Sequence, residues 1–290
     1  MAAGKEIRTK IKSVQNTQKI TRAMQMVSTS KMRKTQDRMK AARPYAEKIR
    51  EVMAHLAQSN SVSETVSPFL RKPQQIKKVG VILITADKGL CGGLNTNAIK
   101  LFTEKLRDYR NQNVEIEVCA LGQKGLVAAN RLKVNVLSSA VGLGDIPHMS
   151  KIIGPLSGIF KKFYEKELDA VYVVFSEFVN TMKQQPIFEQ VLPLTERDLH
   201  IESKYPWDYI YEPSAEEVLN ELIRRYLESV VYQCLADNMA SEQASRMIAM
   251  RAATDNAGEA IHQLSLAYNK SRQAAITKEL AEICAGAAAV

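Results

Sequence analysis

Hydrophobic residues recur every three or four positions at both ends of the 290-residue chain. This alternation is typical of the seam of a coiled coil, so each end predicts a helix with a stripe that faces the other. Upstream, two shorter runs repeat the rule with a phase break between them: Ile7, Ile11 and Val14, then Ile20, Met24 and Val27. The two long series are Met32, Thr35, Met39, Ala42, Ala46, Ile49, Met53 and Leu56, and Met247, Met250, Thr254, Ala257, Ile261, Leu264 and Tyr268.

Glycine and proline are concentrated in the middle of the chain. Residues 5–60 contain no glycine and only Pro44, and residues 214–290 contain no proline. This distribution predicts an N-terminal helix in residues 1–60, a central domain in 61–213 and a C-terminal helix in 214–290. Helices of about 50 and 70 residues would span about 75 and 105 Å. Because they bracket the central domain, we expect them to pair antiparallel.

The central segment alternates strands with helices, which predicts an α/β, Rossmann-like domain with a mainly parallel sheet. Val79 to Thr85 is a continuous apolar, β-branched run that ends in a turn, as a buried parallel strand does. The other expected strands are 114–121, 170–175 and an edge strand 187–194, and the expected helices are 95–110, 122–129 and 149–164.

The net excess of positive charge lies in the N-terminal segment. Residues 1–60 hold 14 Lys and Arg against 4 Asp and Glu, a net charge of +10, whereas the whole chain carries +9. Such a segment favours an acidic partner, which leaves nucleic acid, anionic lipid and an acidic protein surface open, besides an ordinary solvated helix face. The segment lacks interleaved aromatic residues, which argues against nucleic acid.

Several classes of protein are disfavoured by composition. The longest apolar run, Val79 to Ile84, is much shorter than the ~20 residues of a membrane-spanning helix. The charged N-terminus predicts no secretory signal. The four cysteines are far apart and lack histidines at ligand spacing, so we expect small buried hydrophobes in a reducing compartment and no metal or redox site. They are Cys91, Cys119, Cys234 and Cys284.

One glycine-rich loop, Gly89 to Asn95, follows a predicted strand and precedes a predicted helix, which is where phosphates bind in α/β proteins. Its glycine spacing matches neither nucleotide motif, and Lys88 precedes the glycines. We therefore expect a tight turn with a close backbone approach. No acid–base pair or nucleophile elbow stands out, so the chain predicts no catalytic site and no cofactor. A nucleotide-binding enzyme remains the rival interpretation.

Motifs at both ends of the chain resemble those of the ATP synthase gamma chain family. They are Lys5-Glu6-Ile7-Arg8, Gln18-Lys19-Ile20-Thr21-Arg22-Ala23-Met24 and Ser30-Lys31-Met32-Arg33 at the start, and Ala252-Ala253-Thr254-Asp255-Asn256-Ala257, Tyr268-Asn269-Lys270 and Arg272-Gln273-Ala274-Ala275-Ile276-Thr277 at the end. The glycine loop is also similar to that of the family, and the overall likeness is greatest to bacterial members.

The resemblance implies a non-catalytic rotor shaft that couples proton-driven rotation of a c-ring to ATP synthesis. Its partners would be a hexamer of alpha and beta subunits, the epsilon subunit and the c-ring. By position in the motifs, Lys19, Arg22 and Met24 would lie near acidic loops of beta subunits, and Arg272 and Gln273 would bond to a beta subunit. The location implied is the cytoplasmic face of the bacterial inner membrane, reached only through partners.

Overall fold

A computed structural model describes residues 2–58, 75–146, 148–194 and 214–288, together with residues 69, 71, 73 and 212. The chain divides into two compact units, one of residues 1–29 with 246–290 and one of residues 30–245. The domain boundaries predicted from the sequence, at 60/61 and 213/214, lie outside the described residues and stay a prediction. The helices and strands are α1 (Ala2–Gln58), β1 (Lys78–Ile84), α2 (Leu94–Asn111), β2 (Glu115–Leu121), α3 (Gln123–Arg131), β3 (Asn135–Ala140), α4 (Met149–Tyr164), β4 (Ala170–Phe178), β5 (Gln184–Leu192) and α6 (Ala215–Ala288).

A five-stranded sheet forms the centre of the unit of residues 30–245. Its order is β3-β2-β1-β4-β5. The β1, β2, β3 and β4 pairs are parallel, and β5 runs antiparallel to β4. β1 is buried on both faces from Val79 onward, which explains why its sequence is a continuous apolar run. The mainly parallel sheet predicted from the sequence is therefore confirmed.

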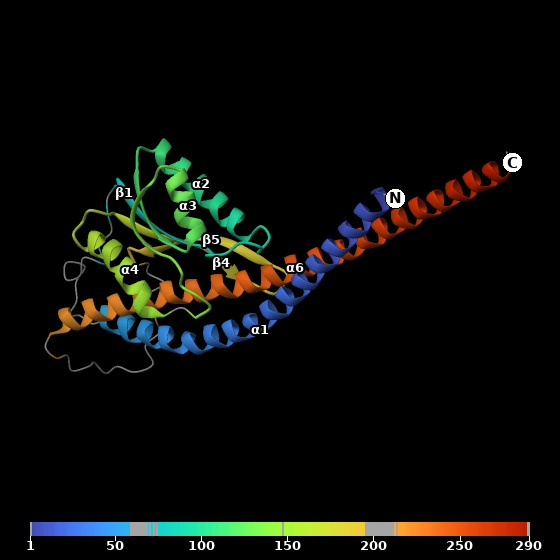
Figure 1. Ribbon diagram of the computed structural model, residues 1–290. Helices are drawn as coiled ribbons and strands as arrows, with labels where there is room; N and C mark the ends of the chain where they lie inside the picture. Colours follow the sequence, from blue (N-terminus) through green and yellow to red (C-terminus); the bar gives the residue numbers. More distant parts are fainter. Residues whose placement is uncertain are drawn as a thin grey trace. The chain divides into compact units, whose positions relative to one another are not determined.

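Helices cover both faces of the sheet (Figure 1). On one face, Phe102 and Leu106 of α2 and Ala129 of α3 pack on Val81 and Val118 of the central strands. On the other face, the core contains residues of α4, of α1 and of α6 as far as Met239. The first part of α6 is thus a core helix of this unit. The residues that α6 buries there are Leu219, Ile223, Tyr226, Leu227, Val231, Cys234, Leu235 and Met239.

The strand β3 was missed by the sequence reasoning. It is an edge strand of six residues, of which three are half-buried, two are exposed and one is buried. Its sequence, Asn-Val-Leu-Ser-Ser-Ala, neither alternates cleanly nor forms an apolar run, so neither strand signal applies. The other expected strands and helices are confirmed, with ends that differ by a few residues.

Candidate partner-binding surface

The buried face of α1 follows an unbroken heptad spacing through its first 35 residues. The residues on it are buried or half-buried, and the series changes from apolar to polar and back: Ile7, Ile11, Val14, Gln18, Thr21, Gln25, Ser28, Met32 and Thr35. Ile20 and Val27, which the sequence reasoning placed on the seam after a phase break, are 60% and 52% exposed. That placement is wrong because the spacing continues through polar residues instead of shifting phase.

The seam predicted on α6 is confirmed. Met250 and Ala257 are buried, and the other five members of the series are half-buried. In the unit of residues 1–29 and 246–290, Thr21 Oγ1 lies 2.7 Å from Thr254 Oγ1. Gln18 donates from Nε2 to the Thr254 carbonyl at 3.2 Å, and the same nitrogen lies 3.1 Å from a Cβ built on Gly258. Residue numbers rise on one helix as they fall on the other, so the predicted antiparallel pairing is confirmed.

A groove of about 590 Å³ lies along this helix pair. Arg22 comes from α1, and Arg251 and Asp255 come from α6. The sequence reasoning did not identify the α6 members, because they lie 229 or more positions away in the chain and carry no motif of their own. The remaining lining residues are Gln18, Gln25, Thr254 and Gly258. Two guanidinium groups and one carboxylate line this groove, which suits an acidic partner.

The predicted contact residues fall into two groups. Lys19 and Arg22 are exposed on α1, and Met24 is half-buried beside them. Arg272 and Gln273 are exposed on α6. The pairing of Thr21 with Thr254 places Arg272 level with the first residues of α1, so the two groups lie on the order of 30 Å apart along the pair. They form two separate surfaces and do not converge on one site.

Beyond the start of α1, α6 continues without a partner helix in this unit. Every described side chain from Ile276 to Ala285 is exposed. Ile276, Leu280 and Ile283 lie on one face at steps of four and three, and they are 48%, 57% and 67% exposed. Cys284 is exposed there as well, so the expectation that all four cysteines are buried is wrong for this residue. Its position on an unpaired helix end explains the difference.

The glycine-rich loop after β1 is a tight turn, as expected. Leu90 and Gly92 have φ of 62° and 57°, in the left-handed region that favours glycine. Asn95 accepts from the Ala86 N–H through Oδ1 at 3.0 Å, and Ser245 of α6 donates to the Cys91 carbonyl at 2.8 Å. A Cβ on Gly92 would lie 3.5 Å from the Ser245 hydroxyl. That distance is an ordinary van der Waals contact, so the expected tight turn is confirmed, whereas a close backbone approach that only glycine would allow is not found at Gly89, Gly92 or Gly93.

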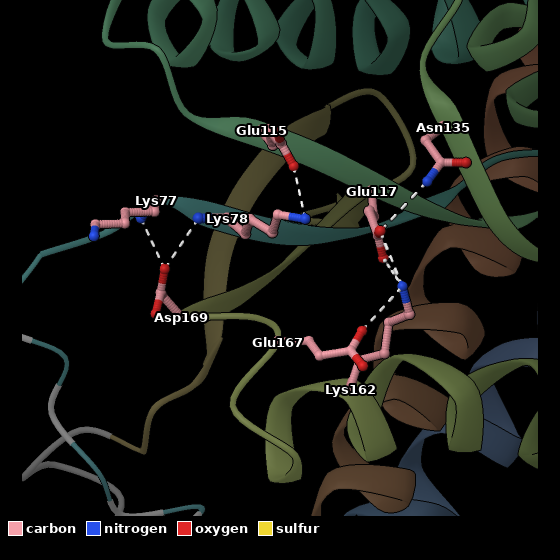
Figure 2. A network of polar contacts seen from close by, with 8 residues as sticks. All are labelled: Lys77, Lys78, Glu115, Glu117, Asn135, Lys162, Glu167 and Asp169. Carbon is pink, nitrogen blue, oxygen red and sulfur yellow. Dashed lines mark hydrogen bonds and ion pairs between the residues drawn. The ribbon is translucent and has the colours of Figure 1, made fainter.

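A network of charged side chains lies near the amino ends of β1, β2 and β4, opposite the end of the sheet that carries the glycine-rich loop (Figure 2). Glu117 of β2 is 9% exposed, and both its carboxylate oxygens accept from Lys162 of α4, at 3.0 and 2.9 Å. The hydrogen bond to Glu117 raises the pKa of Lys162. Asp169 accepts from the backbone N–H groups of Lys77 and Lys78, at 2.7 and 3.0 Å, which caps the start of β1. These contacts tie α4 and the loop before β4 to the sheet.

Metal and membrane sites find no support in the described part of the chain. Among those residues, no group of His, Cys, Asp and Glu side chains is placed to hold a metal ion. Within the same residues, no helix combines the length and the apolar character needed to cross a bilayer.

Comparison with known proteins identifies the family. The sequence model of the ATP synthase family matches residues 3–290. The ATP synthase gamma chain of Chromobacterium violaceum is 64% identical over 290 residues, with 100% of both chains covered. The chain belongs to the ATP synthase gamma chain family. A second relative, the gamma chain of Neisseria meningitidis serogroup C, is 60% identical over 293 residues and is also fully covered.

Solved structures of ATP synthases share the fold of this gamma-family chain. A chain from the central stalk and c-ring of the Tetrahymena thermophila mitochondrial ATP synthase matches with a TM-score of 0.60 and 25% identity, covering 81% of this chain and 99% of that chain. A chain of the Euglena gracilis mitochondrial ATP synthase matches with a TM-score of 0.71 and 18% identity, covering 99% and 94%. The chain is thus a subunit of an ATP synthase, a membrane-associated complex, and its role is that of the central rotor shaft.

Proposed function

We propose that the chain has no catalytic site of its own and couples rotation of a c-ring to conformational changes in catalytic beta subunits. The observation that carries this proposal is the antiparallel helix pair, whose exposed surface bears Lys19, Arg22 and Arg251. Each face of such an asymmetric pair favours a different state of a beta subunit by differential contact. Proton flow turns the ring, and nucleotide chemistry occurs on the partners.

The partners follow from the same surfaces. Acidic loops of beta subunits would contact Lys19, Arg22 and Met24, and the groove adds Arg251 to that surface. Arg272 and Gln273 would bond to a beta subunit at the second surface. Exposed ion pairs contribute only ~0 to 1 kcal/mol each and are screened by salt, so no single contact locks the shaft at one angle. Such weak contacts suit a part that must turn.

The unit of residues 30–245 would contact the epsilon subunit and the c-ring. In this proposal the chain is peripheral and lies at the cytoplasmic face of the bacterial inner membrane, held there by partners. The bacterial gamma chains that are 60–64% identical over their full length support this location. Nucleic acid has no role in the proposal.

A reversible cross-link tests the coupling. Arg22→Cys would be combined with Cys284→Ser, because Cys284 is exposed while the other three cysteines are buried. Oxidation against a cysteine in the acidic loop of a beta subunit should abolish ATP hydrolysis by the complex, and reduction should restore it. Full turnover in the cross-linked complex would refute rotation. Lys12→Cys, also exposed on α1, serves as a control for oxidation alone.

The rival interpretation, a nucleotide-binding enzyme, has its own test. Calorimetry of the isolated chain with ATP or NAD should give no stoichiometric binding. Tight binding of one equivalent would favour the rival instead.

A further inference from the structure

The carboxyl ends of β1 and β4 lie where α/β proteins with an open sheet usually bind ligands. The chain runs from β1 outward to β2 and β3 and then returns to β4 on the other side of β1. The carboxyl ends of β1 and β4 therefore form a topological switch point, which in open α/β sheets is the usual ligand site. In this molecule, side chains of α6 reach the backbone segments on both sides of that point.

Two hydrogen bonds join α6 to these segments. Asn238 accepts from the backbone N–H of Ser176 through Oδ1 at 3.1 Å, and both residues are buried. Ser176 lies beyond the last pair of β1 and β4, Leu83 with Val174, so the bond is made where the two strands have ceased to pair. Seven residues further along α6, Ser245 donates to the carbonyl of Cys91 at 2.8 Å. The bonds therefore hold one face of α6 to the last residues of β4 and to the loop after β1.

Stability alone does not account for polar side chains on this face. Asn238 and Ser241 are 1% and 0% exposed, and Asn238 Nδ2 and Ser241 Oγ have no hydrogen-bond partner. Buried unbonded polar atoms are unfavourable, and an apolar face would avoid them. Apolar burial is non-directional, as in the core that holds α6 from Leu219 to Met239, whereas hydrogen bonds fix an angle. The polar face thus adds directional contacts just where the apolar core ends.

We propose that Asn238 and Ser245 are positioning residues that fix the rotation of α6 about its own axis relative to the carboxyl edge of the sheet. Asn238 adds a directional contact inside the stretch that the core already holds, and Ser245 extends the contacts of α6 beyond Met239, so torque passes between the sheet and the helix without twist of these last turns. This inference rests on the proposed function, because only a rotating shaft needs such a hold.

Hydrogen exchange of the assembled complex tests the hold directly. In Asn238→Ala the Ser176 amide loses its acceptor, and we expect its exchange to become about tenfold faster. Ser241→Ala is the matched control, since it lies on the same buried face of the same helix but its hydroxyl makes no bond. Unchanged protection of Ser176 in Asn238→Ala, or equal loss in both variants, would overturn the proposal.

Proton uptake into vesicles that contain the complex tests whether these two residues are needed to pass torque between the sheet and α6. The double variant Asn238→Ala/Ser245→Ala should hydrolyse ATP at the parental rate but take up fewer protons for each ATP. In the Asn238→Ala background, Ser245→Thr restores a hydroxyl and should raise the number of protons taken up for each ATP above that of the double variant. Ser241→Ala should keep the parental number. A parental ratio in the double variant, or a proportionate loss of both activities, would overturn the positioning role of Asn238 and Ser245 while leaving the proposed function intact. A parent complex that hydrolyses ATP without proton uptake would overturn both.

Discussion

The ion pair of Glu117 and Lys162 offers a prediction of stability that can be worked from the structure. The Glu117 side chain is 11% exposed and that of Lys162 is 28% exposed, so the pair lies between a surface pair and a buried one. Surface pairs contribute about 0 to 1 kcal/mol, and breaking a buried pair costs about 3–5 kcal/mol. We expect Lys162→Met to cost about 2 kcal/mol, because it removes the two hydrogen bonds from Lys162 and leaves Glu117 with the Asn135 amide at 3.3 Å and the more distant charge of Lys78.

A double-mutant cycle separates the pair from its surroundings. Glu117→Leu with Lys162→Met replaces the ion pair by an apolar pair, and we expect the free energy of unfolding to return to within about 1 kcal/mol of the parent. Urea denaturation followed by far-UV circular dichroism measures all four corners. A cost below about 0.5 kcal/mol for Lys162→Met alone would show that water screens the pair and that the reasoning from burial fails.

Further outcomes follow from single features of the fold. The folded-state pKa of Lys162 is raised above its ordinary value of 10.5. The contribution of Lys162 to the free energy of unfolding should therefore be complete below about pH 10.5 and vanish as the pH rises through the folded pKa. In urea titrations at alkaline pH, the parent should lose more stability than Lys162→Met. Gly122→Ala should cost at least about 3 kcal/mol of unfolding free energy in the same assay, since its φ is 105° and the new Cβ would lie 2.1 Å from the Thr85 carbonyl oxygen. Gly142→Ala is the control and should cost only about 1 kcal/mol, because its φ is 67° and a Cβ there would meet no atom within 4 Å. Equal costs for the two variants would contradict the clash at Gly122. Maleimide at neutral pH should label one thiol of the folded isolated chain, Cys284, and none in Cys284→Ser. The other three thiols are buried, and burial raises the pKa of Cys119 to about 11. Rapid labelling of a second thiol would show that the fold opens.

Much of the architecture could be predicted from local patterns. The scarcity of glycine and proline at both ends of the chain indicates the long helices, and the continuous apolar run of β1 indicates a strand buried on both faces. The α6 seam was also predictable, because its apolar residues keep the heptad spacing. The position of α1 on its seam was not, since Ile20 and Val27 are apolar yet exposed while Thr21 and Ser28 are polar yet buried.

Contacts between segments that are distant in the chain could not be predicted from the sequence. A threonine on α1 is buried because Thr254 lies opposite it, and no local signal records that pairing. Arg251 joins Arg22 in the groove for the same reason. The heptad rule, applied to spacing before residue type, would have found Gln18 and Thr21. The contact residues taken from the family motifs, such as Lys19 and Arg272, remain predictions.

The end of α6 has a practical consequence for handling the chain by itself. Ile276, Leu280 and Ile283 form an apolar stripe in water on a helix that continues past its neighbour. Hydrophobic stripes of this kind promote self-association, and the exposed thiol of Cys284 adds the hazard of covalent dimers. Preparations of the isolated polypeptide should therefore be more soluble after truncation at Ala275, or under reducing conditions at low concentration, than at full length in air.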